Sequence, residues 1–390
     1  MPASPSRASE RAPLTLADLY AVTGATPPAS LVPPPAFERV VRVARHFSPD
    51  HSRIVHTEVR LEEAGPVDVV VSVPTGSGEW RSAVPAAWWC EPTWQRVDAF
   101  VEATKAPDSR LGRALTSAWL EFDAPSDAAA PLPGVFAGLD DRQGVPASLS
   151  PTGRLRHRLA LAADAAEPLH GDALPPAVME ALRRVFERVP DAARLVYVGM
   201  MIQRSSPALR LCFLGMVPEQ VRAFLHDVGW PGDADALVET VASLADGGPV
   251  PHMLHLDVWA DGVQPRLGVE FPFQRIEQVW GRLSVGAWLQ RLVRAGLASP
   301  AKVAALSAWP KYGVYWPTPG AEPQAVFRYV NHVKLVSDGG RLAAKAYLTM
   351  ETHCWLFPRD QVETYGGPVW LPPELPPSTQ RTRPRIPRRS

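Results

Sequence analysis

The chain has 390 residues, enough for one large domain or two ordinary ones, and 46% of them are hydrophobic, which is enough to fill a core. Forty basic and forty acidic side chains give a formal charge of zero, which argues against a dedicated nucleic-acid-binding protein. Three scattered cysteines form no CxxC pair, so we predict no disulfide framework and no metal site. No run is apolar enough to span a membrane, and the start has no signal core, so we expect a cytoplasmic protein.

Proline is concentrated in three stretches, two of them at the ends of the chain. Stretches rich in proline favour loops or disordered segments rather than core elements. We therefore predict a disordered N-terminal segment at 1–36, one domain at 37–371 and a disordered Pro/Arg-rich tail at 372–390. Residues 142–171 show no pattern clear enough to predict their structure.

A helix followed by a β-hairpin recurs along the rest of the chain. The first unit has apolar residues at helical spacing over 36–47, and then two alternating strands at 53–62 and 66–74. Later hairpins are expected at 116–124 with 134–140, 193–204 with 209–216, 253–260 with 266–273, and 326–336 with 341–350. Helices are expected between them at 94–106, 175–189, 218–230, 234–246, 275–297 and 299–309. The pattern predicts five helix–hairpin units and ten antiparallel strands.

In almost every predicted strand one face is apolar and the other carries the charges. In the last hairpin, Arg328 and Val330 fall on the face of His332 and Lys334, whereas Tyr329 falls on the apolar face. Tyr197 is likewise expected on the apolar face of its strand. Helices must cover the apolar faces, and closing the sheet into a barrel would remove its edges, so the charged faces would line a polar lumen. The alternative is two ordinary α+β domains whose sheets are half exposed.

The charged faces supply the candidate ligand-binding residues. They are Arg204, Arg210, His255, Asp257, Arg266, Glu270, His332, Lys334, Lys345 and Tyr347. His332 and Lys334 could bind a ligand carboxylate, or they could pair with Glu270 or Asp257 across the lumen. Cys212 shares the face of Arg210, but no histidine partner can be inferred, so a buried and inert thiol is expected. No catalytic residue can be assigned from the sequence.

The cyclic order of helices and hairpins resembles the ABBA fold, or prenyltransferase barrel, over about residues 37 to 358. The segment LHLDVWADGVQPRLGVE at 254–270 is similar to a strand-turn-strand pattern of the aromatic prenyltransferases, and AKAYL, with Lys345 and Tyr347, is similar to their Lys-x-Tyr strand signature. The resemblance implies an α+β fold, a ten-stranded antiparallel barrel whose polar lumen is surrounded by helices. In that family the lysine contacts a diphosphate and the tyrosine shields an allyl cation.

The sequence departs from that family where the chemistry needs aromatic shielding. An allyl cation must be kept from water by aromatic faces, yet only Tyr347 among the tyrosines is expected in the lumen. Gly268 and Glu270 stand where the family would place another Lys-x-Tyr. An aromatic or peptide prenyltransferase using dimethylallyl diphosphate as co-substrate is therefore the alternative function rather than the first.

Short segments such as HVKLVSDGGRLAAKAYL are similar to the crocagin-type peptide-binding proteins of ribosomal-peptide biosynthesis. That resemblance implies an accessory role without catalysis and without a cofactor. We predict a protein that holds a precursor peptide in or at the barrel while a peptide-modifying enzyme acts on it. A lumen with both signs of charge suits a peptide better than a pure anion. The sequence leaves a homodimer open and does not identify the peptide.

Overall fold

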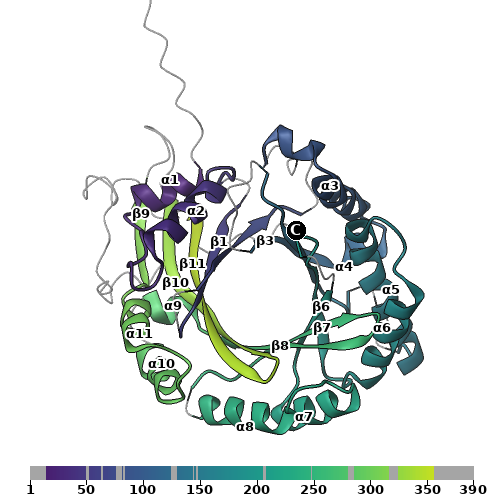
Figure 1. The fold of residues 1–390 in the computed structure, drawn as a ribbon. Helices are drawn as coiled ribbons and strands as arrows, with labels where there is room; N and C mark the ends of the chain where they lie inside the picture. Colours follow the sequence, from purple (N-terminus) through teal and green to yellow (C-terminus); the bar gives the residue numbers. More distant parts are fainter. Residues whose placement is uncertain are drawn as a thin grey trace, which may run out of the picture.

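Ten β-strands close into a barrel, and helices surround it (Figure 1). The structure is a computed structural model, and it describes residues 15–49, 52–62, 65–75, 81, 84–123, 130–143, 145, 148–204, 208–246, 248–279, 285–315 and 324–354. The predicted tail at 372–390 lies outside the described residues. The predicted ten-stranded antiparallel barrel is confirmed.

The strands follow the predicted hairpins closely. They are β1 (Ile54–Arg60), β2 (Val67–Val73), β3 (Leu115–Phe122), β4 (Gly134–Leu139), β5 (Arg194–Met200), β6 (Leu209–Leu214), β7 (Met253–Trp259), β8 (Gly262–Pro272), β9 (Lys311–Tyr315), β10 (Gln324–Asp338) and β11 (Arg341–Cys354). Each strand pairs antiparallel with its neighbours in the order β11-β1-β2-β3-β4-β5-β6-β7-β8-β10, and a further pairing of β10 with β11 closes the ring.

The helices lie in the connections between the hairpins. They are α1 (Leu16–Val22), α2 (Pro34–Ala44), α3 (Pro92–Thr104), α4 (Arg110–Ala114), α5 (Pro151–His170), α6 (Pro176–Arg188), α7 (Pro218–Asp227), α8 (Ala234–Ala245), α9 (Arg275–Val279), α10 (Val285–Arg294) and α11 (Pro300–Ser307), with a 3₁₀ turn at Ala86–Cys90. The five helix–hairpin units predicted from the sequence are present. The region that gave no pattern contains α5, a helix of 20 residues that begins at a Ser150 cap.

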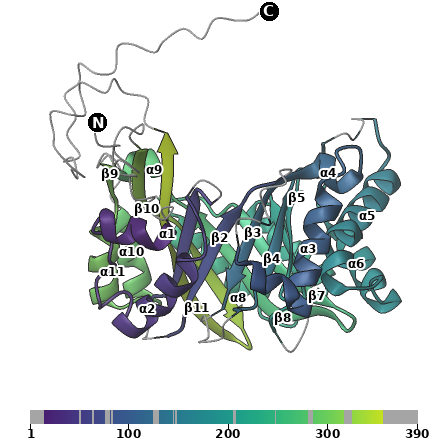
Figure 2. The same cartoon turned by 90° about the horizontal axis from the view of Figure 1, so that it is seen from above.

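Two elements, β9 and α1, were not predicted from the sequence. β9 pairs with the first part of β10, outside the closed ring, and Figure 2 shows it beside α9 at one end of the barrel. α1 lies in the segment 1–36, so the prediction of disorder is wrong for the described part of that segment. Thr15 and Asp18 form a capping box, and Leu19 and Tyr20 are buried. Burial of these two side chains outweighs the proline content around them.

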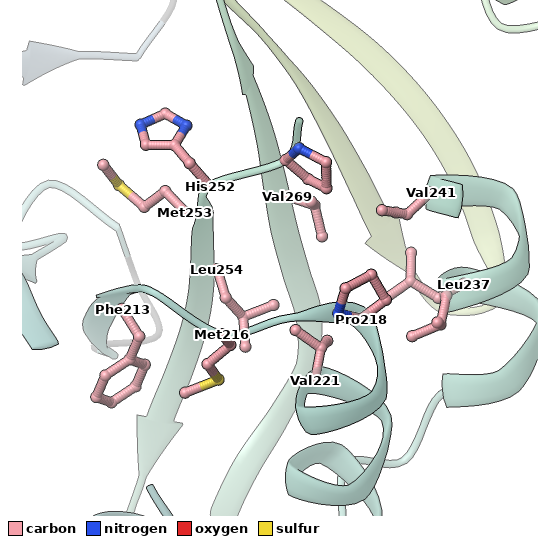
Figure 3. Close-up of a pocket in the computed structure, with 12 residues that line it drawn as sticks. Phe213, Met216, Pro218, Val221, Leu237, Val241, His252, Met253, Leu254 and Val269 are labelled. Carbon is pink, nitrogen blue, oxygen red and sulfur yellow. The ribbon is translucent and has the colours of Figure 1, made fainter. Parts of the chain in front are cut away.

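The hydrophobic core is a layer between the outside of the barrel and the helices. Strand residues of the apolar parity, such as Val59, Leu211 and Leu348, are buried in it together with helix residues. Figure 3 shows the layer where Leu254 and Val269 of the barrel wall face Leu237 and Val241 of α8. The cavity in this layer has a volume of about 30 Å³, which is room for a water molecule rather than for a ligand.

The tryptophan-rich segment that leads into α3, together with the first turn of that helix, packs into this same layer. Trp88 and Trp94 are buried, with their ring centroids 4.9 Å apart. Trp80 lies outside the described residues. Trp88 and Trp94 are therefore core residues and not part of an exposed docking patch. None of the helices in the described residues is long and apolar enough to cross a membrane.

Candidate functional site

A cavity of about 390 Å³ occupies one part of the barrel lumen. Its volume is in the range of small-molecule sites in proteins. Its wall is formed by Ile54, His56, Val70, Trp119, Glu121, Phe136, Tyr197, Cys212, His252, Met253, His255, Glu270, Pro272, Phe273, Asn331, His332, Lys334 and Tyr347. Ile54 begins β1 and Phe273 follows β8, so the cavity lies toward the strand ends that connect to helices, away from the hairpin turns.

Beside the cavity, Glu58 of β1 is enclosed by its neighbours on β11. Lys345 Nζ and the Tyr347 hydroxyl both donate hydrogen bonds to its carboxylate, and Asp68 Oδ2 lies 3.7 Å from the same ammonium. Burial would raise the pKa of Glu58, but Lys345 holds it well below the usual range. We call Glu58, Asp68 and Lys345 the acidic-wall cluster. Lys345 is the one cation for two carboxylates in this cluster, and it is not part of the cavity wall.

Toward the hairpin turns, two more cations are matched with carboxylates. Arg210 makes a bidentate pair with Asp257, at 2.7 and 2.8 Å, and both side chains are buried. Arg204 donates to Asp123 at 2.6 and 2.8 Å and to Glu121 at 3.3 Å. Such bidentate contacts are among the strong hydrogen bonds of proteins.

On the opposite part of the wall, three neighbouring strands bring a thiol, an imidazole and a carboxylate together. Cys212 Sγ of β6 lies 3.2 Å from His255 Nδ1 of β7, and His255 Nε2 lies 2.6 Å from Glu270 Oε1 of β8. Lys334 Nζ of β10 is also 3.2 Å from His255 Nδ1. We call Cys212, His255 and Glu270 the thiol-wall cluster. All three side chains, and Lys334, line the cavity.

Burial governs the protonation of these groups. It raises the pKa of the Cys212 thiol and lowers the pKa of His255 to about 4, where Lys334 adds to the lowering. Burial alone would raise the pKa of Glu270, but His332 and His255 hold it well below its usual range. At neutral pH the cluster therefore contains a thiol, a neutral imidazole and an ionised carboxylate.

Two further histidines lie flat against aromatic rings of the cavity wall. His332 stacks on Tyr347 with ring centroids 3.8 Å apart, and His56 stacks on Trp119 at 5.1 Å. His56 Nδ1 is 2.8 Å from the Thr349 hydroxyl. Burial lowers the pKa of His332 to about 4 and that of His56 to about 3, so both rings are neutral at pH 7. The wall thus offers flat and uncharged surfaces to a ligand.

Comparison with known proteins bears on the fold. The chain is similar to the apo form of the prenyltransferase PriB, with 14% identity and a TM-score of 0.50, over 86% of this chain and 93% of that one. It is also similar to 6-dimethylallyltryptophan synthase from Micromonospora olivasterospora, with 18% identity and a TM-score of 0.48, over 85% and 94% of the two chains. No family model and no curated protein sequence matches the chain. The chain adopts the ABBA-type fold.

Within this ABBA barrel, the Lys-x-Tyr segment does not have its expected surroundings. Lys345 is paired with Glu58. Gly268 lies on the lumenal face of β8, where a side chain would come too close to its neighbours. A Cβ atom at residue 268 would lie 2.6 Å from Lys334 Cε and 3.3 Å from His255 Cβ. The missing side chain leaves space for Lys334 and His255 in the thiol-wall cluster.

The structure places the ten predicted residues in three groups. His255, Glu270, His332, Lys334 and Tyr347 line the cavity. Arg210, Asp257 and Arg266 lie beside it around a much smaller pocket that His255 and Lys334 share. Lys345 and Arg204 are held in ion pairs, away from the cavity wall. Charged side chains of the barrel therefore pair across strands more than they face open space.

Two strand irregularities overturn face assignments made from alternation. β5 shifts register between Leu195 and Tyr197, so Tyr197 pairs with Cys212 and lines the cavity rather than the core. β10 shifts register between Val330 and Val333. A bulge of one residue exchanges the two faces of a strand beyond it.

The bulge in β10 explains why the predicted face of this strand is only half correct. His332 and Lys334 lie in the lumen, as expected, but Val330 is in the main core and Arg328 lies over the Trp309 ring at 4.7 Å. Tyr329 belongs to a separate small cluster and donates to Glu351 at 2.7 Å.

Sequence reasoning missed most of the aromatic wall. Trp119 shares the parity of Glu121 on β3, so alternation alone could have placed it in the lumen. Phe136 lies on a strand, β4, that is buried along its whole length and therefore shows no alternation. Its ring occupies the space above Gly199, where a Cβ would come within 2.5 Å of it. That contact joins residues far apart in sequence and leaves no local signal.

Proposed function

We propose that this protein binds a peptide and takes an aromatic side chain of it, together with a neutral or positively charged group, into the barrel. The biological role that we attach to this binding is the accessory one in the biosynthesis of a ribosomally made, modified peptide. The protein would hold the precursor peptide while a separate enzyme modifies it. Prenyl transfer from dimethylallyl diphosphate is the second candidate, because the fold is that of a prenyltransferase and Tyr347 lines the lumen.

The charges of the cavity wall support the first candidate. Glu270 is ionised and lines the cavity together with Lys334, while His255 and His332 are neutral. Glu121 also lines the cavity, but it is paired with Arg204 and burial raises its pKa. An allyl diphosphate carries several negative charges and needs several cations that converge on it. Arg210 and Lys345, which could supply them, are already paired with carboxylates. Placing a diphosphate there would break those pairs.

The uncharged surfaces of the wall support an aromatic ligand. Trp119, Phe136, Tyr197 and Tyr347 present rings to the cavity, and its volume of about 390 Å³ is ample for one large side chain. Stacked and edge-to-face aromatic contacts contribute beyond the area that they bury. The neighbouring carboxylates favour an amide or ammonium on the ligand over an anion.

Calorimetric titration with three small indoles tests this proposal. Tryptophan amide, N-acetyltryptophan amide and N-acetyltryptophan share one ring and differ in charge, from positive through neutral to negative. We expect the anion to bind at least about 10-fold more weakly than the neutral ligand. Trp119→Leu should weaken all three, whereas the control Trp89→Leu, outside the barrel wall and beside Trp94, should leave them unchanged. Tightest binding by the anion would contradict the proposal.

Incubation with dimethylallyl diphosphate and tryptophan-containing peptides separates the two candidates. We expect the intact mass of the peptides to stay unchanged and the diphosphate to leave the melting temperature of the protein where it was. A peptide that gains one prenyl unit would decide for the enzyme and against an accessory role.

A further inference from the structure

The thiol-wall cluster has the arrangement of a nucleophile, a base and an orienting group. Cys212 and His255 are direct partners across β6 and β7, so the sheet register itself sets the thiol beside the ring. Glu270 reaches the other ring nitrogen from β8 at 2.6 Å. A cysteine with a histidine partner that a third group orients is the geometry of covalent catalysis, and it is recognised by geometry rather than by order in the sequence.

The ionised carboxylate fixes which nitrogen of His255 acts as the base. Glu270 accepts a hydrogen bond from Nε2–H, so the lone pair of Nδ1 is left to accept from the Cys212 thiol or from Lys334 Nζ, each 3.2 Å away. Burial raises the pKa of the thiol, which keeps it protonated until a base removes the proton. The imidazole stands 3.2 Å away and can take that proton as the sulfur attacks.

Lys334 adds a positive charge at the same point. Its ammonium is 3.2 Å from His255 Nδ1, and in the part of the chain that the structure describes no carboxylate lies within 4 Å of it. The absence of a side chain at Gly268 leaves room for this approach. A cation beside a cysteine stabilises the thiolate, and it can also stabilise a negative oxygen that forms on an attacked carbonyl.

We propose that Cys212 is a nucleophile that accepts an acyl group from an activated ester or thioester of an aromatic acid. Cys212 Sγ attacks the carbonyl carbon, a C–S bond forms, and the bond from that carbon to the leaving oxygen or sulfur breaks. The thiol proton passes to His255 Nδ1 and then to the leaving alkoxide or thiolate. Water or an amine later attacks the thioester and restores the thiol. The inference does not depend on the peptide that the lumen binds.

The aromatic class of the donor follows from the wall around the thiol. Tyr197 is the cross-strand partner of Cys212 on β5, and Phe136 and Trp119 line the same cavity. A flat acyl group can lie among these rings while its carbonyl carbon meets the sulfur. An anionic acyl group would face Glu270 and Glu121 instead.

Acylation with p-nitrophenyl acetate and p-nitrophenyl phenylacetate tests the proposal. The experiment uses the variant Cys90→Ser/Cys354→Ser, in which Cys212 is the one thiol. We expect the intact mass to gain one acyl group, peptide mapping to place it on Cys212, and neutral hydroxylamine to remove it, as it removes thioesters but not amides. The phenylacetyl ester should react faster than the acetyl ester. An equal or lower acylation rate with the phenylacetyl ester would refute the aromatic class of donor.

Variants of the cluster separate a nucleophile from a buried thiol. His255→Gln should slow acylation by about 100-fold, the usual size of a general-base contribution. Glu270→Gln should slow it less and shift the pH dependence of the rate. Cys212→Ser should lose acylation. Binding of tryptophan amide is measured separately on the wild-type protein, so failure of one proposal does not carry the other with it. Thermal melting establishes that each variant is folded.

The wild-type protein gives a result even if a variant does not fold. A thiol that is acylated only after the protein is denatured is inert, and the proposal is then wrong. A hydroxylamine-resistant adduct on Lys334 would also overturn it, because the amine and not the thiol would be the nucleophile.

Discussion

The acidic-wall cluster and the thiol-wall cluster lie on different parts of one barrel and each has a lysine of the β10–β11 hairpin at hand, yet the two lysines differ in what they leave available. Lys345 is paired with Glu58 and lies near Asp68, beside the cavity but not in its wall. Lys334, on the neighbouring strand β10, faces the cavity, and among the described residues it has only His255 within hydrogen-bonding distance. Alternation predicted both lysines in the lumen. Their neighbours in space differ, because Lys345 is paired with Glu58 whereas Lys334 contacts His255.

The difference shows that a lumenal position is not by itself a binding position. Removing one partner of a complete buried ion pair destabilises the protein, because the other charge stays buried without compensation. Removing a buried group that faces a cavity should change the stability of the protein less and its ligand affinity more. The four predictions below test this contrast.

Lys345→Ala should produce the largest loss of stability. The change leaves Glu58 buried without its cation, which costs about 3–5 kcal/mol in the free energy of unfolding. Denaturant unfolding monitored by circular dichroism measures it. The double variant Glu58→Gln/Lys345→Met should recover most of the loss. A stable Lys345→Ala protein that had merely lost ligand affinity would show that the acidic-wall cluster is a binding site after all.

Leu348→Ala should cost about 2–5 kcal/mol, the range for truncating a buried leucine. Leu348 is adjacent to Tyr347 on β11 but points into the core between barrel and helices. Ligand affinity of the folded variant should remain as in the wild type, because the side chain is outside the lumen. A larger effect on affinity than on the melting temperature would mean that the faces of β11 are reversed.

As the pH falls, the stability that the neutral histidines of the cavity wall contribute should be lost before the stability that the acidic-wall cluster contributes. The pKa of His255 and of His332 is about 4 in the folded state, below the ordinary value of 6.5, so the unfolded chain takes up protons first as the pH falls. Stability is therefore lost between pH 6.5 and 4, by about 2 kcal/mol for each ring at pH 5. Glu58 has a lowered pKa, so the stability that it contributes is lost only below its ordinary value of 4.5.

Melting temperatures across this pH window measure the effect. His332→Gln should flatten the curve, because glutamine does not titrate. Glu180→Gln, on the exposed face of α6, serves as a control that should leave the slope unchanged. Unchanged stability of the wild type from pH 7 to pH 5 would contradict the burial of these rings.

Lys334→Met should have the smallest effect on stability, below about 1 kcal/mol, because it removes a buried ammonium that has no ion pair among the described residues. Burial lowers the pKa of Lys334, which indicates that the charged form is not favoured by its surroundings. The same variant should slow acylation of Cys212. Gly268→Ala, which crowds the Lys334 side chain, should slow it as well. A loss of stability as large as that of Lys345→Ala would remove the contrast between the two clusters.

The sequence by itself determined the barrel. Five helix–hairpin units with one apolar and one charged face favoured a closed barrel over two half-exposed sheets, and the observed ring has the predicted strands. Alternation is a local property of the strand, so it can be read without knowing the partners. The same property put His255, Glu270, Lys334 and Tyr347 on the charged faces, and these four residues line the cavity.

Only the tertiary structure decided which lumenal groups meet. The bulges in β5 and β10 exchange faces within a strand, and they arise from pairing with neighbours rather than from the residues of the strand. The contact of Cys212 with His255 spans 43 residues, and that of Lys345 with Glu58 spans 287. Strand order and register set these distances, because a hydrogen bond or an ion pair depends on position in space and leaves no periodic trace in the chain.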